Sequence, residues 1–437
     1  IGRSDPRRPR PSERVSLALI GCGAMGNWNL APFLDDPRVQ VTVTCDPVKD
    51  AKAYGYSKDW AKKWRGGRVP FAEKGDTRYG TKGCRAVADW REVIDDPTVD
   101  AVLITTPDHW HAIMAIEAMK AGKHVYCQKP LTMSIAEGRR MCEVAAETGV
   151  VFQVGSQQRS SSEFRVAAEF IQNGYLGKCT ECDIGLPGGR GPYWGYPPAK
   201  TAKRFPAYFG DEAMWNMWQG PAQHWDNNTF YPTIPQPMCW RSNSRTGGGM
   251  ITDWGAHWID VLHWTMGFER TGPVAVENMT SNLGDDPCLD WASEYSFDLV
   301  YANGFRAHVS SAARSGVAYH GEKGDVFANS SKLERPEFLR KWNEKRDLKP
   351  TDRHFYRAKD GHSHESDFID GIYERRPIAT DCEIGHRSIS ACHVANACLR
   401  LGLKSLKWDP LAERFVGPNA DAANALAVVP HFNGWKI

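Results

Sequence analysis

Short apolar runs alternate with helix-length segments over the first 155 residues of the chain. Each run is bounded by polar or glycine-rich turns, as is typical of strands that are buried on both faces of a parallel sheet. Ser134 followed by Glu137 has the capping-box signature of a helix start. The repeated strand–helix units predict a doubly wound parallel sheet, whose ligand lies beyond the carboxyl ends of the strands. The predicted strands are residues 15–20, 39–44, 99–104, 124–127 and 150–154.

After residue 155 the pattern changes. A helix is expected at 163–172 and a strand at 178–186, followed by a long stretch at 187–245 that is rich in Trp, Tyr, Pro and Gly. Helical spacing of apolar residues resumes after Gly249, and an amphipathic helix is expected over 380–402. The predicted parts of the chain are a basic, Pro-rich arm (1–14), a first domain (15–155) and a second domain (156–437).

Composition and charge agree with a two-domain globular protein. The chain has 437 residues, which is more than one hydrophobic core usually holds, and 41% of them are hydrophobic. A net charge of +2 gives no reason to expect nucleic acid or a membrane surface as partner, and no apolar stretch reaches the ~18 residues of a membrane span. The 12 Cys residues lack disulfide-scaffold spacing and are expected to be mostly buried thiols. The 17 Trp residues fit either a carbohydrate site or a Trp-rich core.

A glycine-rich turn follows the first predicted strand directly. Gly21, Gly23 and Gly26 form G-x-G-x-x-G around Ala24 and Met25, which predicts a tight turn whose backbone approaches a pyrophosphate at a helix N-terminus. Asp46 ends the second predicted strand, 20 residues beyond Gly26. An acid at this place accepts hydrogen bonds from the adenosine ribose and repels a 2′-phosphate, so NAD is favoured over NADP.

Four motifs occur in a fixed order along the chain. They are GCGAMG at 21–26, TTPDHWH at 105–111, QKP at 128–130 and GGGMITDWGAH at 247–257. In order and spacing they resemble the Gfo/Idh/MocA oxidoreductase family. The resemblance implies a Rossmann domain followed by an α+β domain with a large, mostly antiparallel open sheet. It also implies a homo-oligomer, a dimer or tetramer, that associates through this sheet.

The resemblance also implies cofactor contacts at the ends of the strands. Lys129 corresponds to the catalytic lysine of the family's E-K-P motif, but Gln128 replaces the glutamate. Because Gln is uncharged, Lys129 loses an anionic neighbour and is expected to hold its proton less tightly. In addition to the glycine turn and Asp46, the expected cofactor contacts are Thr105, Thr106, Pro107, His109, His111, Gln128, Lys129 and Gln157.

Asp253 and His257 occupy the D-x-x-x-H position of the family. Standing four residues apart, they are expected to share one face of a helix, where the carboxylate orients the imidazole and raises its pKa. An Asp/His pair of this kind is otherwise often structural. With the resemblance, His257 is expected to remove the proton of a secondary hydroxyl while Lys129 binds the same oxygen. The expected substrate contacts are Lys129, Gln157, Arg159, Trp218, Arg241, Asp253 and His257.

Three functions remain open at this point. The first is an NAD-dependent dehydrogenase of a sugar, glycoside or polyol, with C3 as the reacting position. The second is a redox-assisted glycosidase that oxidises C3 transiently, eliminates the aglycone and reduces the product. The third is a non-catalytic, NAD-binding sensor, against which the retained Lys129, Asp253 and His257 argue.

A metal site and the cellular location complete the sequence-based expectations. His362, His364 and Glu365 in GHSHESDF resemble a metal cluster, but no metal is expected because the family uses none. The basic arm and the absence of an initial Met favour a protein that is exported after removal of a leader. The many Cys residues favour the cytoplasm instead, so both locations stay open.

Overall fold

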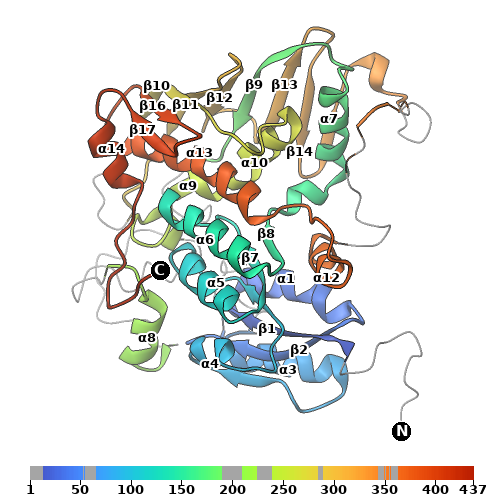
Figure 1. Cartoon of the computed structure of the whole chain (residues 1–437), viewed down its shortest axis with the longest axis vertical. Helices are drawn as coiled ribbons and strands as arrows, with labels where there is room; N and C mark the ends of the chain where they lie inside the picture. The colour runs from blue at the N-terminus through green and yellow to red at the C-terminus, as the bar shows by residue number, and fades with distance from the viewer. Residues whose placement is uncertain are drawn as a thin grey trace.

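The computed structural model describes residues 13–52, 54, 65–188, 209–223, 239–283, 289–342, 349, 351–353, 355 and 363–437. Nearly all of the basic arm and much of the aromatic stretch therefore lie outside the described residues. Two sheets lie one above the other in Figure 1, with helices between them. Among the described residues, no helix is long and apolar enough to cross a membrane.

The N-terminal sheet has six parallel strands in the order β5-β2-β1-β6-β7-β8. Strands β1, β6 and β8 are nearly completely buried because helices cover both faces. The strands are β1 (Val15–Ile20), β2 (Val39–Cys45), β5 (Arg85–Val87), β6 (Ala101–Ile104), β7 (His124–Gln128) and β8 (Phe152–Gly155). This sheet confirms the predicted Rossmann architecture.

Helices from both ends of the sequence cover the N-terminal sheet. One face packs against α1, α3 and α12, and the other against α5 and α6. Ser134 and Glu137 form the predicted capping box at the start of α6. The elements of this half are α1 (Ala24–Asp35), the hairpin β3 (Ala51–Lys52) and β4 (Arg65–Gly66), α3 (Arg68–Tyr79), α4 (Arg91–Ile94), η2 (Asp108–Trp110), α5 (His111–Lys120) and α6 (Ile135–Thr148).

The second sheet has nine strands in the order β15-β14-β13-β9-β12-β11-β10-β16-β17. Only the β9–β12 pair is parallel, so the sheet is mostly antiparallel, as expected. The strands are β9 (Cys179–Gly185), β10 (Ala275–Ser281), β11 (Tyr295–Val300), β12 (Arg306–Ser310), β13 (Gly316–Gly321), β14 (Val326–Asn329), β15 (Lys332–Glu334), β16 (Leu406–Asp409) and β17 (Arg414–Val416).

One face of the second sheet is covered and the other is open. Along β11 and β12, buried residues such as Phe297 and Val309 alternate with polar ones such as Asp298 and His308. Helices α7, α10 and α13 pack on the apolar face. The helices of this half are η3 (Gln157–Ser160), α7 (Ser162–Gln172), α8 (Glu212–Gln219), η5 (Cys239–Ser242), α9 (Gly249–Asp253), α10 (Gly255–Met266), η6 (Glu337–Leu339), α12 (His364–Glu374), α13 (Cys382–Arg400) and α14 (Ala420–Leu426).

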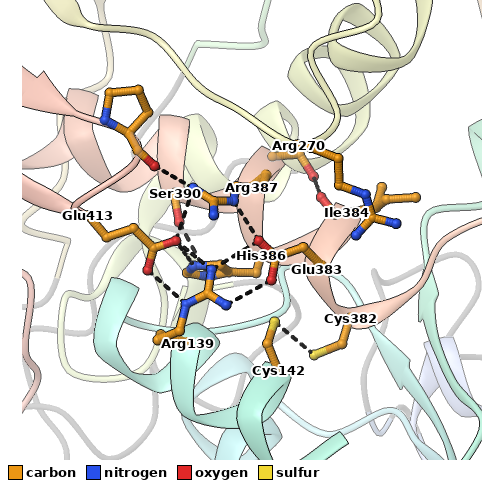
Figure 2. A network of polar contacts seen from close by, with 12 residues as sticks. Arg139, Cys142, Arg270, Cys382, Glu383, Ile384, His386, Arg387, Ser390 and Glu413 are labelled. Atoms are coloured by element: carbon orange, nitrogen blue, oxygen red, sulfur yellow. Dashed lines mark hydrogen bonds and ion pairs between the residues drawn. The ribbon is translucent and has the colours of Figure 1, made fainter. Parts of the chain in front are cut away.

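Helix α13 lies between the two sheets, at the place where the sequence predicted an amphipathic helix over 380–402. It is buried on nearly all sides because it packs against α6 as well as α10. Figure 2 shows the ion-pair network at this contact. Arg139 of α6 donates to Glu383 at 2.8 Å and to Glu413 at 2.5 Å, and His386 lies 2.9 Å from the same Glu413 oxygen. The network connects the second half of the chain to helix α6, which packs on the N-terminal sheet.

Candidate active site

A cavity opens at the carboxyl ends of the parallel strands. The glycine turn, Asp46 and the residues that follow β6 and β7 line one side of it, and Trp218, Trp240 and Arg241 line another. Parts of the chain more than a hundred residues apart thus meet around one space. This is the place where open parallel sheets bind their ligands.

The backbone of the glycine turn fits the phosphates of a dinucleotide. Gly21 has φ +100°, and a Cβ there would lie 2.7 Å from the Thr105 carbonyl carbon. A Cβ on Gly26 would lie 2.3 Å from the Gly21 carbonyl oxygen. At Gly23, by contrast, a Cβ would meet nothing within 4 Å, so this residue borders open space. Only glycines allow the tight packing and the bare backbone that face the cavity here.

Asp46 is held at the end of β2 by three hydrogen bonds. Its Oδ2 accepts from the Cys22 backbone N–H at 2.7 Å, and its Oδ1 accepts from the Val48 N–H at 2.8 Å and from the Tyr54 hydroxyl at 3.1 Å. Burial raises the pKa of the Asp46 carboxyl to about 6, against the opposing effect of these hydrogen bonds. The carboxylate is therefore mostly ionised at neutral pH. Tyr54 also lines the cavity, and no local motif marks it in the sequence.

Lys129 reaches from the end of β7 to Asp253 at the end of α9. Its Nζ donates to the Asp253 carboxylate at 2.7 Å and to the Asp253 carbonyl oxygen at 2.9 Å. Arg241 Nε donates to the same carboxylate oxygen at 3.0 Å. Burial raises the pKa of Asp253, but the two cations outweigh it and hold the pKa well below its ordinary value. Asp253 thus provides the negative charge beside Lys129 that the uncharged Gln128 lacks.

His257 is placed differently from the prediction. The expected single helix is divided, because α9 ends at Asp253 and α10 begins at Gly255. The Asp253 carboxylate bonds to Lys129 and Arg241, while His257 Nδ1 is buried without a hydrogen-bond partner in the described part of the chain. Burial and the charge of Lys129 lower the pKa of His257 to about 3, although Asp253 opposes this. Asp253 therefore acts on this pKa in the predicted direction, but burial and Lys129 outweigh it.

The two histidines of the TTPDHWH segment hold the backbone around the cavity. His109 Nε2 lies 3.0 Å from the Trp218 carbonyl oxygen. His111 bridges two carbonyl oxygens, that of Pro130 at 2.7 Å and that of Thr106 at 2.9 Å. Neither histidine lines the cavity, whereas Thr105, Thr106 and Pro107 do. Both imidazoles therefore hold neighbouring backbone segments in place through their carbonyl oxygens.

Gln128 and Gln157 share one partner, Asn29 of α1. The Nε2 atoms of the two glutamines donate to Asn29 Oδ1 at 2.7 and 3.0 Å, and Gln157 also donates to the Tyr126 hydroxyl at 3.1 Å. Gln128 lines the cavity and Gln157 does not. Asn29 stands in a helix without a recognisable motif, so sequence reasoning missed it.

The expected substrate contacts divide into two groups. Trp218, stacked on Trp215 with ring centroids 5.2 Å apart, lines the cavity, as does Arg241. Arg159 instead lies away from the cavity lining. Its side chain is 2% exposed and is paired with Asp260 at 2.7 Å and with Glu269. The structure thus brings three of the expected contacts, Lys129, Trp218 and Arg241, to the cavity and places Arg159 in a buried ion pair.

The described residues contain no cluster of His, Cys, Asp and Glu that is able to hold a metal ion. His364 bonds to the Ser160 hydroxyl and to the Val154 carbonyl oxygen instead. His362 lies outside the described residues.

Two sequence profiles match nearly the whole chain. Residues 15–156 match an oxidoreductase family with an NAD-binding Rossmann fold, and residues 164–437 match the C-terminal alpha/beta domain of the same oxidoreductase family. The chain belongs to the Gfo/Idh/MocA family of oxidoreductases. Its N-terminal domain is accordingly an NAD-binding Rossmann fold, into which the glycine turn and Asp46 fit.

Curated relatives include two dehydrogenases of sugar-like compounds. Levoglucosan dehydrogenase of Pseudarthrobacter phenanthrenivorans is 28% identical over 166 residues, 38% of this chain and 39% of that protein. scyllo-Inositol 2-dehydrogenase (NAD(+)) of Bacillus subtilis is 41% identical over 166 residues, 38% of this chain and 42% of that protein. These alignments span about two fifths of each relative.

Solved structures of the same fold cover most of the chain. GenD2 from gentamicin A biosynthesis, solved in complex with NAD, has a TM-score of 0.60 at 19% identity and covers 93% of this chain and 100% of its own. Aldose-aldose oxidoreductase from Caulobacter crescentus has a TM-score of 0.59 at 17% identity, with 90% and 99% covered. At these identities the likeness concerns the fold alone.

Proposed function

We propose that the protein transfers a hydride between a secondary hydroxyl of a sugar, glycoside or polyol and NAD, with C3 of a pyranose ring as the reacting position. One observation carries the proposal. The Lys129 ammonium is held by Asp253 on the cavity that the glycine turn also lines. The names of the curated relatives, a levoglucosan and an inositol dehydrogenase, agree with a sugar-like substrate.

NAD rather than NADP is the proposed cofactor. The glycine turn would hold the pyrophosphate and Asp46 the adenosine ribose, with Thr106, Pro107 and Gln128 toward the nicotinamide. The nicotinamide ring supplies a hydride acceptor when it is bound. Because the Asp46 carboxylate is mostly ionised at neutral pH, it would repel the 2′-phosphate of NADP.

Lys129 is proposed to bind the reacting oxygen. An ammonium group has three N–H donors, and two of them point to Asp253. The third is left for a substrate oxygen in the cavity. The positive charge stabilises the negative charge that develops on this oxygen as the carbon loses its hydride. Asp253 acts by fixing the position of Lys129, and Arg241 in turn helps to fix Asp253.

The aromatic wall of the cavity fits a sugar ring. Trp218 and Trp240 line it beside Arg241, whose guanidinium lies 4.2 Å from the Trp240 ring centroid. Flat aromatic faces contact the C–H faces of a sugar, and the guanidinium donates to its hydroxyls. These residues are proposed to determine which hydroxyl approaches Lys129.

A substrate panel tests this function. Levoglucosan, myo-inositol, scyllo-inositol and p-nitrophenyl glucosides are offered with NAD⁺, and both reduced nicotinamide and p-nitrophenol are followed. We expect reduced nicotinamide with at least one of these compounds. Release of p-nitrophenol without accumulated reduced nicotinamide would favour transient oxidation instead. Neither product, although NAD⁺ binds, would favour the non-catalytic sensor.

A further inference from the structure

Two cysteine thiols meet where helix α6 contacts helix α13, and neither has a part in the function proposed above. Cys142 lies in α6 and Cys382 is the first residue of α13, and their Sγ atoms are 3.4 Å apart. Figure 2 shows both side chains beside the ion pairs of Arg139. Cys142 is 9% exposed and Cys382 4% exposed. The pair thus joins the two halves of the chain through residues that are 240 positions apart in the sequence.

The ion pair next to the thiols holds them together. Arg139 lies about one turn before Cys142 on α6, and Glu383 directly follows Cys382 on α13. Two guanidinium nitrogens of Arg139 donate to the two carboxylate oxygens of Glu383, at 2.8 and 3.0 Å. Bidentate pairs of this kind fix the geometry of both side chains. A disulfide bond brings its sulfur atoms to about 2.0 Å, so bond formation here needs an approach of only about 1.4 Å.

We propose that Cys142 and Cys382 are a site of disulfide formation, which cross-links the two halves of the chain under oxidising conditions. The oxidant is a small disulfide compound such as oxidised glutathione. The thiolate of one cysteine attacks a sulfur of this compound, releases one glutathione thiolate and leaves a mixed disulfide. The thiolate of the other cysteine then attacks the protein sulfur of the mixed disulfide and releases the second glutathione thiolate. Two cysteine thiols are thereby oxidised, one oxidised glutathione is reduced, and the two thiol protons pass to the two glutathione thiolates.

The surroundings of the thiols favour a structural bond over a rapid redox sensor. The hydrogen bond with Cys382 and burial raise the pKa of the Cys142 thiol, so the reactive thiolate is scarce at neutral pH. Sensor cysteines are instead accessible and have a low pKa. A structural disulfide stabilises mainly by restricting the unfolded chain, and more so when the loop it closes is long. The bond is therefore expected to increase resistance to unfolding and to change kcat little, because the sulfur atoms are already in contact.

Peptide mapping of the wild type tests the proposal directly. The native protein is equilibrated with oxidised and reduced glutathione at mildly alkaline pH until its thiol content is constant, and is then unfolded, alkylated and digested. We expect a pair of peptides joined through Cys142 and Cys382. The melting temperature should rise by roughly 3–5 °C above that of the protein kept in dithiothreitol. Alkylation of both thiols, or separate glutathione adducts on them, would overturn the assignment of this site.

Two variants separate the cross-link from other effects of oxidation. Cys382→Ser keeps the shape of the side chain at the start of α13, and it should show neither the joined peptides nor the rise in melting temperature. Cys179→Ser, at a half-buried cysteine of β9, is the matched control and should show both. A rise in Cys382→Ser equal to that of the wild type would overturn the stabilising role of the bond. The joined peptides are measured in the wild type without substrate, so the result depends neither on the folding of Cys382→Ser nor on the proposed function.

Discussion

At the scale of single residues, the position of the Lys129 side chain depends on Asp253, which lies 124 positions away in the sequence. The motifs predicted Lys129 and Asp253 as neighbours of one site because each lies in its own local signature. They did not predict that Asp253 bonds to Lys129 and Arg241 instead of His257. Asp253 bonds to these two cations because the helix is divided at Trp254 and because η5 places Arg241 beside Asp253. The four-residue spacing of Asp253 and His257 predicts neither feature.

Replacement of Asp253 should affect stability as well as activity. Asp253→Asn leaves the Lys129 and Arg241 cations without their buried anion. Loss of one partner from a buried ion pair typically costs about 3–5 kcal/mol, and we expect the free energy of unfolding to fall by about this amount. Urea unfolding measures it. A much smaller loss would mean that the cations find water or another anion in the variant.

Replacement of Asp46 should change the choice of cofactor. Asp46→Asn removes the negative charge and leaves one carbonyl oxygen, which can accept from only one of the Cys22 and Val48 N–H groups that now donate to separate carboxylate oxygens. We expect weaker NAD⁺ binding and stronger NADP⁺ binding, so that the ratio of the two dissociation constants moves toward one. Calorimetric titration with each cofactor checks this. An unchanged ratio would show that Asp46 does not discriminate between them.

At the scale of elements, the sequence predicted the strands of the first sheet and the helix α13, but not the two helices that α13 packs against. The strands were found because each is a short apolar run with a clear turn at its end. For α13, apolar and small residues lie around most of the helix, which hides the fact that α6 packs on one side and α10 on the other. Arg139 of α6 pairs with Glu383 of α13 and with Glu413 between β16 and β17, both more than 200 positions away in the sequence.

Arg139 allows this contact to be tested with a neighbouring control. Arg139→Met removes the bonds to Glu383 and Glu413, and we expect a loss of about 1–3 kcal/mol in the free energy of unfolding. Arg140→Met, on the next residue of α6, removes only exposed pairs with Glu143 and Glu147 and should cost much less than Arg139→Met. Equal losses in urea unfolding would contradict the assigned role of the network.

The same network predicts a dependence of stability on acid. Partial burial raises the pKa of Glu383, but hydrogen bonds from Arg139 and Arg387 outweigh it and lower the pKa to about 2. Since the folded-state pKa lies below the unfolded value of about 4.3, this stabilisation is present above that value and is lost as the pH falls toward 2. Melting temperatures recorded between neutral and acidic pH should fall less steeply for Arg139→Met than for the wild type. Parallel curves would contradict this.

At the scale of the whole molecule, the open face of the nine-stranded sheet is the surface proposed for self-association. Glu181 lies exposed near the middle of this face on β9. If the sheets of two copies pack together, Glu181→Arg should shift the mass from light scattering toward the monomer, with little effect on the melting temperature. A wild type that is already monomeric, or a variant of unchanged mass, would contradict association through this face.

In the proposed reaction, a carbon-bound hydrogen of the substrate leaves as hydride while Lys129 binds the oxygen on the same carbon. The most direct test uses the best compound of the panel, with deuterium at the reacting carbon, in single turnovers of the wild type and of Lys129→Met. We expect deuterium at C4 of the reduced nicotinamide, slower turnover than with the unlabelled compound, and a loss of at least about 10²-fold in Lys129→Met. Lys120→Met, at an exposed lysine of α5, should match the wild type. Deuterium that appears in water instead of the nicotinamide, or equal rates for Lys129→Met and the wild type, would contradict it.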